Sequence, residues 1–192
     1  MVSFPSNLLK KGILMAIKIS TLESYADKLM KSAVAATLTE AHDLNQATAF
    51  LCHSHKDKKL VEGVQKLLLS YGWTVYIDWQ DNSLPEKPDQ VTALKIKESI
   101  DNAEWFLFLA TPNSTASRWC PWEIGFADSS KGSKKILIIP TEADNGYTYG
   151  SEYLQLYKHL DHSTNLKSGA EGVAIFSPNK TTGRHISSLN IL

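Results

Sequence analysis

Short apolar runs alternate with longer amphipathic segments along the middle of the chain. Apolar runs lie at residues 47–52, 73–78, 104–110 and 134–140, and a shorter one lies at 172–176. The run at 73–78, WTVYID, is rich in β-branched and aromatic residues, which favour strands. The runs at 104–110 and 134–140 hardly alternate with polar residues, which is typical of strands buried on both faces of a sheet. The pattern predicts five strands.

The segments around these runs have helical periodicity. Ser20 and Glu23 have the spacing of a capping box at the start of an N-terminal helix. Val91, Leu94 and Ile100 lie roughly on one stripe of a later helix. The pattern predicts helices at residues 20–42, 56–72, 90–103 and 121–131, and one more around 151–160.

Strands and helices that alternate in this way predict a parallel sheet flanked by helices, with right-handed crossovers. Five such strands most often take the flavodoxin-like order 2-1-3-4-5. The predicted fold class is therefore α/β, a flavodoxin-like, doubly wound, five-stranded parallel sheet with an extra N-terminal helix. The expected organisation is an N-terminal extension with its helix at 1–45, the α/β domain at 46–177 and a C-terminal tail at 178–192.

Composition excludes several classes of protein. Twenty basic and twenty acidic residues among 192 give no net charge, so no basic excess indicates nucleic acid or an anionic membrane as partner. Cys52 and Cys120 are too few for a disulfide framework and suit a reducing cytosol. No apolar stretch approaches the ~20 residues of a membrane span, and the run at 12–17 is too short for a signal peptide. We expect a cytoplasmic protein, with either Met1 or Met15 as its start.

Two polar loops should meet at one edge of the predicted sheet. In the order 2-1-3-4-5, ligands bind beyond the carboxyl ends of the strands, at the switch point between the first and third strands. The loops there read HSHKD, at 53–57, and TPNSTASRWCPWE, at 111–123. The second loop places Glu123 beside Trp119 and Trp122. A solvated carboxylate favoured by the helix dipole is the alternative, but the location favours a carboxylate that takes part in chemistry.

Three segments resemble the sequence boxes of TIR domains. AFLCHSHKD, at 49–57, is similar to the first box, and VYIDWQDNSLPEKPD, at 75–89, resembles the second strand with its long loop. FLFLATPNSTASRWCPWEIG, at 106–125, is similar to the third strand, the Ser-containing loop and the Trp-Cys-x-x-Glu segment. The order and spacing match, and the WEIG ending resembles stand-alone bacterial TIR proteins of the Thoeris antiphage type. LPEKPD departs from the family, because many relatives carry a Pro-Gly pair there.

The resemblance implies an enzyme that cleaves NAD, either an NAD glycohydrolase or an ADP-ribosyl cyclase, and makes an ADP-ribose-derived signal in bacterial antiphage immunity. In enzymatic members the Glu four residues after the Trp is catalytic, and Glu123 holds that position. NAD is then the substrate, with no further cofactor. A separate effector protein would sense the product, and self-association through TIR–TIR contacts stays open.

One carboxylate could suffice for this chemistry. Nicotinamide leaves NAD as a neutral molecule from a cationic ring, so no acid is needed to protonate it. An ionised Glu123 could stabilise the positive charge on the ribose and accept hydrogen bonds from its hydroxyls. Trp119 and Trp122 could supply apolar walls that lower the local dielectric constant, or stack on a base.

The other candidates each have a second interpretation. The tryptophans could equally be core anchors, Ser114 could cap a turn, and Asp57 is most simply a helix N-cap. The histidines near Cys52 could suggest a metal, but no further Cys/His pair completes a site, so none is expected. The predicted substrate-binding residues are His53, Ser54, His55, Asp78, Trp79, Ser114, Trp119 and Trp122.

Three other functions compete with NAD cleavage. A TIR adaptor that only signals by homotypic contacts would not need Glu123. A nucleoside deoxyribosyltransferase-like enzyme would expect further nucleoside-binding carboxylates, which the sequence does not place. A receiver domain needs an acidic cluster after the first and third strands, where FLCHSH and LFLATP provide none. The chain also lacks the glycine-rich motifs of dehydrogenases and P-loop proteins.

Overall fold

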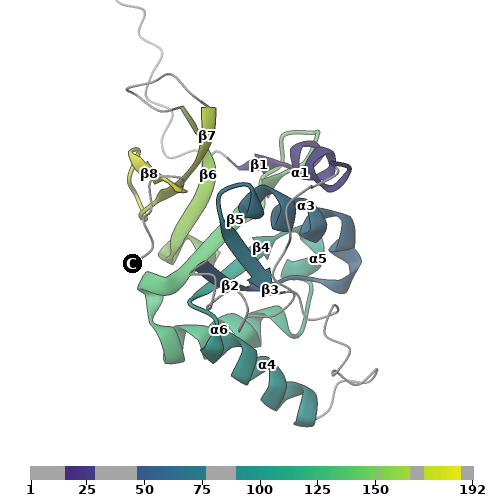
Figure 1. Ribbon diagram of the computed structural model, residues 1–192, viewed down its shortest axis with the longest axis vertical. Coiled ribbons are helices and arrows are strands. Elements are labelled where there is room, and N and C mark those ends of the chain that lie inside the picture. Colours follow the sequence, from purple (N-terminus) through teal and green to yellow (C-terminus); the bar gives the residue numbers. More distant parts are fainter. Residues whose placement is uncertain (1–15, 29–46, 77–89, 151, 165–170, 187–192) are drawn as a thin grey trace, which may run out of the picture.

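The computed structural model describes residues 16–28, 47–76, 90–150, 152–164 and 171–186. These residues form one mixed, mostly parallel sheet with helices on both faces (Figure 1). Its strands are β1 Ile17–Lys18, β2 Ala47–Cys52, β3 Trp73–Tyr76, β4 Trp105–Ala110, β5 Ile136–Glu142, β6 Lys158–Thr164, β7 Glu171–Phe176 and β8 Gly183–His185. The predicted α/β class is confirmed.

The sheet has the strand order β3-β2-β4-β5-β6-β7-β8, and β1 pairs with the end of β5. The first five strands of this order are parallel to one another. Their order is the predicted 2-1-3-4-5, because β2 is the first strand of the alternating region. The carboxyl ends of β2 and β4 therefore lie side by side, with their loops at the same edge.

The fifth parallel strand is not the one that the pattern predicts. It is β6, in a segment predicted as part of a helix around 151–160; only a short 3-10 helix, η4 Glu152–Leu156, precedes it. The predicted strand at 172–176 exists as β7, but it pairs antiparallel with β6 and with β8. In KHLDHST only Leu160 is a buried apolar residue. Pairing with β5 and β7, rather than local periodicity, therefore makes this segment a strand.

The helices are α1 Ile19–Ala26, α3 Lys58–Leu69, α4 Gln90–Asn102, α5 Pro112–Thr115 and α6 Cys120–Lys131, with short 3-10 turns η1 His55–Asp57 and η3 Ser133–Lys135. The capping box predicted at Ser20 and Glu23 is wrong. Lys18, which belongs to β1, holds the N-cap position of α1, and no side chain caps the helix there. Residues 29–42 of the predicted N-terminal helix lie outside the described residues.

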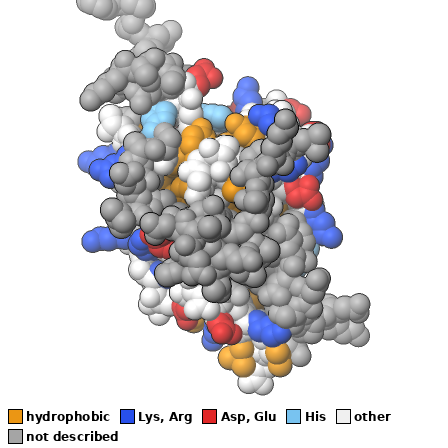
Figure 2. Space-filling view, in the orientation of Figure 1, with side chains coloured by type: hydrophobic (Ala, Val, Ile, Leu, Met, Phe, Trp, Pro, Cys, Tyr) orange, Lys and Arg blue, Asp and Glu red, His pale blue; other side chains and the backbone are white. Residues whose placement is uncertain are grey.

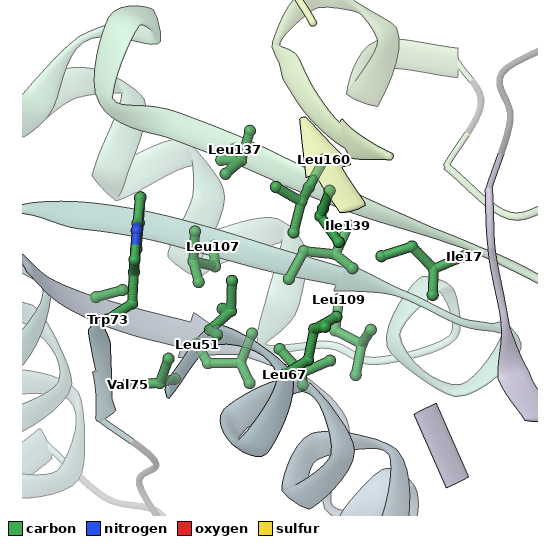
Figure 3. Close-up of a cluster of buried hydrophobic side chains, with 14 of the residues drawn as sticks. Ile17, Leu51, Leu67, Trp73, Val75, Leu107, Leu109, Leu137, Ile139 and Leu160 are labelled. Atoms are coloured by element: carbon green, nitrogen blue, oxygen red, sulfur yellow. The ribbon is translucent and has the colours of Figure 1, made fainter. Parts of the chain in front are cut away.

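Two apolar clusters cover the two faces of the sheet. On one face α1 and α3 pack against alternate residues of the strands, and Figure 3 shows Leu67 of α3 lying against Leu51 and Leu109. On the other face α4 and α6 pack against the remaining residues, including Phe106 and Phe108 of β4. Burial on both faces explains why the β4 sequence is continuously apolar.

The buried stripe of α4 differs from the predicted one. Thr92, Ile96 and Ile100 are buried at a spacing of four residues, whereas Val91 and Leu94 are 52% and 59% exposed. Positions four apart lie on one face of a helix, and the contacts of Ile96 and Ile100 set that face. None of the helices in the described part of the chain is long and apolar enough to cross a membrane.

Candidate active site

A buried carboxylate joins the two loops at the carboxyl edge of the sheet. Asp57, 5% exposed, accepts hydrogen bonds from the hydroxyl of Thr111 at 2.5 Å and from the amide of Asn113 at 2.6 Å. Asp57 does hold the N-cap position of α3, but its side chain makes no capping bond. The predicted capping role is therefore wrong, and Asp57 instead ties the loop after β2 to the loop after β4.

The loop after β4 is shaped by a capping box at the start of α5. The amide of Ser114 donates to the Thr111 hydroxyl at 3.0 Å, and the amide of Thr111 donates to the Ser114 hydroxyl at 2.8 Å. Ser114 is fully buried. The structure thus shows the capping role that the sequence offers for Ser114, while its contact with a substrate stays a prediction.

The start of α6 packs directly on the end of β2. The Cys120 thiol donates to the carbonyl oxygen of His53 at 3.4 Å, and the Cys52 thiol donates to the carbonyl oxygen of Cys120 at 3.9 Å. Pro121 occupies the first turn of α6, where its missing amide hydrogen costs nothing. These contacts fix the first turn of α6 at the predicted switch point.

Glu123 lies in that first turn and is only 6% exposed. Its carboxylate neighbours the Cys52 thiol. Burial, a hydrogen bond with Cys120, and the charge and hydrogen bond of Glu123 raise the pKa of Cys52 well above its ordinary value. Cys52 therefore stays a protonated thiol at neutral pH and is not an activated nucleophile. A buried carboxylate is costly unless it is hydrogen-bonded, so simple solvation does not describe Glu123.

The loop after β2 places its residues in different environments. His53 is buried, and its Nδ1 lies 2.7 Å from the carbonyl oxygen of Leu51. Ser54 caps the 3-10 turn η1 by accepting from the amide of Lys56 at 3.4 Å. His55 is exposed, with its ring edge-on to that of His53 at 6.0 Å between centroids. Their contact with substrate phosphates stays a prediction.

The two tryptophans of the WCPWE segment touch edge to face, with ring centroids 5.4 Å apart. Trp119 is partly buried and packs against the core on the α4 and α6 face. Trp122 is 37% exposed, stacks on Phe126 at 6.4 Å and lies 5.6 Å from the ammonium of Lys97 on α4. Trp119 is thus partly a core anchor, and a binding role for either indole stays a prediction.

Tyr153 is a neighbour of the site that sequence reasoning missed. Its side chain is 41% exposed, and partial burial, followed by the nearby Cys52 and Cys120, raises the pKa of its phenol. Tyr153 belongs to η4, in the segment predicted as a regular helix. No local pattern links that segment to the edge of β2, so the signal comes only from the tertiary fold.

Asp78 and Trp79 lie outside the described residues. Among the ranges that the structure describes, no group of three or more His, Cys, Asp or Glu side chains could hold a metal ion. The described site therefore holds two buried carboxylates, Glu123 in the first turn of α6 and Asp57 between the loops after β2 and β4, with Trp119 and Trp122 beside Glu123 in the sequence.

A doubly wound parallel sheet with a carboxylate after its third strand agrees with the arrangement that the sequence boxes predict. A family model for the TIR domain matches residues 49–172, more than half of the chain. The chain therefore belongs to the TIR domain family, as its sequence boxes predict.

Two proteins with related sequences show which members of the family this chain resembles. The chain is 33% identical over 134 residues to a Bacillus cereus (strain MSX-D12) protein named "Probable 3' cyclic ADP-D-ribose synthase ThsB'", covering 68% of this chain and 69% of that protein. It is 26% identical over 98 residues to a Cytobacillus dafuensis protein named "Putative cyclic ADP-D-ribose synthase TIR2". That second match covers 50% of this chain and 26% of the relative.

Proposed function

We propose that this chain is an enzyme that cleaves NAD and cyclises the ADP-ribose that remains. The observation that carries the proposal is the buried Glu123 at the switch point of the sheet, within the residues that the TIR domain model matches. The names of the two relatives, both cyclic ADP-D-ribose synthases, support it.

The proposed reaction breaks the bond between the nicotinamide nitrogen and the ribose carbon. The electron pair leaves with nicotinamide, which departs as a neutral molecule. The carboxylate of Glu123 stabilises the cationic ribose carbon while the bond lengthens, and its burial strengthens this interaction because little water screens it. A ribose hydroxyl of the same molecule then attacks the carbon and loses its proton, which closes a ring; water in its place would give ADP-ribose.

The other residues predicted to bind the substrate have proposed supporting roles. His53, Ser54 and His55 hold the phosphates, and Trp119 and Trp122 exclude water or stack on a ring. Asp78, Trp79 and Ser114 complete the substrate contacts. No cofactor is required, because NAD is itself the substrate. Since NAD is an intracellular dinucleotide, the proposed place of action is the cytoplasm.

We also propose that the product is a signal in antiphage defence rather than a by-product of NAD depletion. A separate effector protein would bind it, and TIR–TIR self-association would be one way to switch the enzyme on. The resemblance to Thoeris-type proteins supports this role, as does the relative named 3' cyclic ADP-D-ribose synthase.

Product analysis tests the proposal. The protein, purified from resting and from phage-infected cells, is incubated with NAD, and the products are resolved by mass spectrometry. We expect free nicotinamide and a product one water lighter than ADP-ribose. Filtered lysate from infected cells carrying the protein should then activate a partner effector. If ADP-ribose is the sole product and the filtrates are inactive, the protein hydrolyses NAD, and the proposed cyclisation and signalling role are contradicted. If neither preparation releases nicotinamide, the proposal that the chain is an enzyme is contradicted.

A further inference from the structure

A hollow lies at the opposite edge of the sheet from Glu123. It has a volume of about 410 Å³ and is lined by Trp105, Lys158, Ile175, Ser177, Thr182, Gly183 and Arg184. Trp105 and Lys158 are the first residues of the parallel strands β4 and β6, whereas Glu123 follows the carboxyl end of β4. The β7–β8 hairpin forms its other wall, so this groove is separate from the candidate active site.

Cations gather over one aromatic ring in this groove. The ammonium groups of Lys135 and Lys158 lie 4.7 Å and 5.7 Å from the ring centroid of Trp105. Lys135 forms an ion pair with Glu104 at 2.6 Å, and Lys158 donates to the carbonyl oxygen of Lys134 at 3.2 Å.

Within the described ranges, neither Lys158 nor the exposed Arg184 has a carboxylate partner. Figure 2 shows basic side chains along the edge of the molecule on which Figure 1 places β8. The groove therefore carries positive charge that nearby acidic groups do not neutralise.

Trp105 contributes an apolar ring to the lining of the groove, and its indole N–H makes no hydrogen bond to the described residues. It is 9% exposed, and its indole packs against Trp73 at 5.6 Å between ring centroids. Its buried Nε1 has no hydrogen-bond partner among the described residues. A buried donor without a partner is unusual. Ser177 and Thr182 offer hydroxyl groups on the hairpin side.

We propose that this groove binds a nucleotide-sized, phosphate-bearing ligand. Lys158 and Arg184 bind the phosphate, since guanidinium and ammonium groups both suit phosphate oxygens, and the ring of the ligand lies toward Trp105. The volume lies within the ~300–1,000 Å³ range typical of small-molecule sites. The proposed site does not depend on the proposed NAD chemistry.

Calorimetric titration of the full chain tests the site with three probes: AMP, inorganic phosphate and adenosine. We expect AMP to bind one site, phosphate to bind more weakly and adenosine weakest. The double variant Lys158→Ala with Arg184→Ala should weaken AMP binding at least tenfold and leave NAD turnover within twofold of wild type. Lys180→Ala, which removes a charge from the same hairpin outside the groove lining, is the matched control and should bind AMP like wild type.

Other outcomes would overturn the proposal. AMP binding that the double variant retains would place AMP elsewhere, for example at the candidate active site. Equal affinity for phosphate and AMP would exclude a role for the ring, and no binding at millimolar AMP would exclude the site. If the double variant fails to fold, the exposed Arg184→Ala substitution alone applies the same test, with a several-fold loss of affinity expected.

Discussion

Asp57 should be a strong stabilising residue of the candidate active site, although it lies outside the substrate-binding set. Its carboxylate accepts from Thr111 at 2.5 Å and from Asn113 at 2.6 Å. Hydrogen bonds to charged groups contribute about 1.5–3 kcal/mol each to the free energy of unfolding. Two such bonds set an upper value of about 6 kcal/mol.

The expected cost of Asp57→Ala is smaller than this upper value. The Thr111 hydroxyl has a second partner in the Ser114 hydroxyl at 3.3 Å, and the partly exposed Asn113 can turn to water. We therefore expect a loss of about 3–4 kcal/mol, which is large beside the ~5–15 kcal/mol total stability of a typical domain. Asp57→Asn keeps one accepting oxygen and replaces the other with an NH2 donor, so it keeps one of the two contacts and should lose less than Asp57→Ala, about 2–3 kcal/mol.

Urea unfolding followed by circular dichroism measures these losses, provided that the slope against urea is unchanged. Asp144→Ala, which removes an exposed carboxylate from the loop after β5, is the control and should stay within about 0.5 kcal/mol of wild type. NAD cleavage by folded Asp57→Ala should also fall, because both loops lose their connection. A loss below about 1 kcal/mol for Asp57→Ala would refute the inference that this carboxylate joins the loops.

Three further predictions concern the packing of the core and the pH dependence of the protein's stability. In Gly63→Ala the new Cβ would lie 2.0 Å from the carbonyl oxygen of Leu22, so α1 must move away from α3; we expect a loss of about 3 kcal/mol in urea unfolding. Leu67→Ala should lower the free energy of unfolding by about 2–5 kcal/mol with little change in the rate of NAD cleavage. Trp119→Ala should do the reverse, with a large fall in the rate of NAD cleavage and a small fall in the melting temperature. If Trp119→Ala unfolds the protein, that indole is a core anchor only. Burial lowers the pKa of His159 below its ordinary value of about 6.5. The unfolded chain therefore binds this proton more readily, and stability should fall as the pH drops below about 6.5 and through the lower folded pKa. Unfolding midpoints at several pH values should show a shallower fall for His159→Gln, and an unchanged slope would contradict this assignment.

The sequence predicts those elements of the fold whose local hydrophobic pattern is strong enough to determine their structure. Continuous apolar runs such as WFLFLA predicted the buried parallel strands, and these place Glu123 at the switch point. The fifth parallel strand escaped prediction because KHLDHST has neither strand-like nor strongly apolar character, and its pairing with β5 is a long-range choice. The buried face of α4 was also predicted wrongly. Val91 and Leu94 are apolar but exposed, because contacts with the rest of the fold select a different face of the helix.

The candidate site likewise contains some residues that the sequence could locate and others that it could not. The position of Glu123 at the switch point was predictable from topology, because α5 and then α6 follow β4 in the chain. Its catalytic role stays a prediction. The network of Asp57, Thr111 and Asn113 was not predictable, because it joins residues more than 50 positions apart through side chains that each suggest a local cap or turn. Tyr153 was missed because the proximity of η4 to Cys52 exists only in the folded chain.

The rate of nicotinamide release by Glu123→Gln tests the central claim most directly. The substitution keeps the shape of the side chain and removes the charge proposed to stabilise the ribose cation. Glu62→Gln, an exposed change on α3, is the matched control. We predict that Glu123→Gln melts like the wild-type protein and releases nicotinamide from NAD at least 100-fold more slowly, while Glu62→Gln keeps the wild-type rate. A folded Glu123→Gln protein that cleaves NAD at the wild-type rate would contradict the catalytic role of this carboxylate.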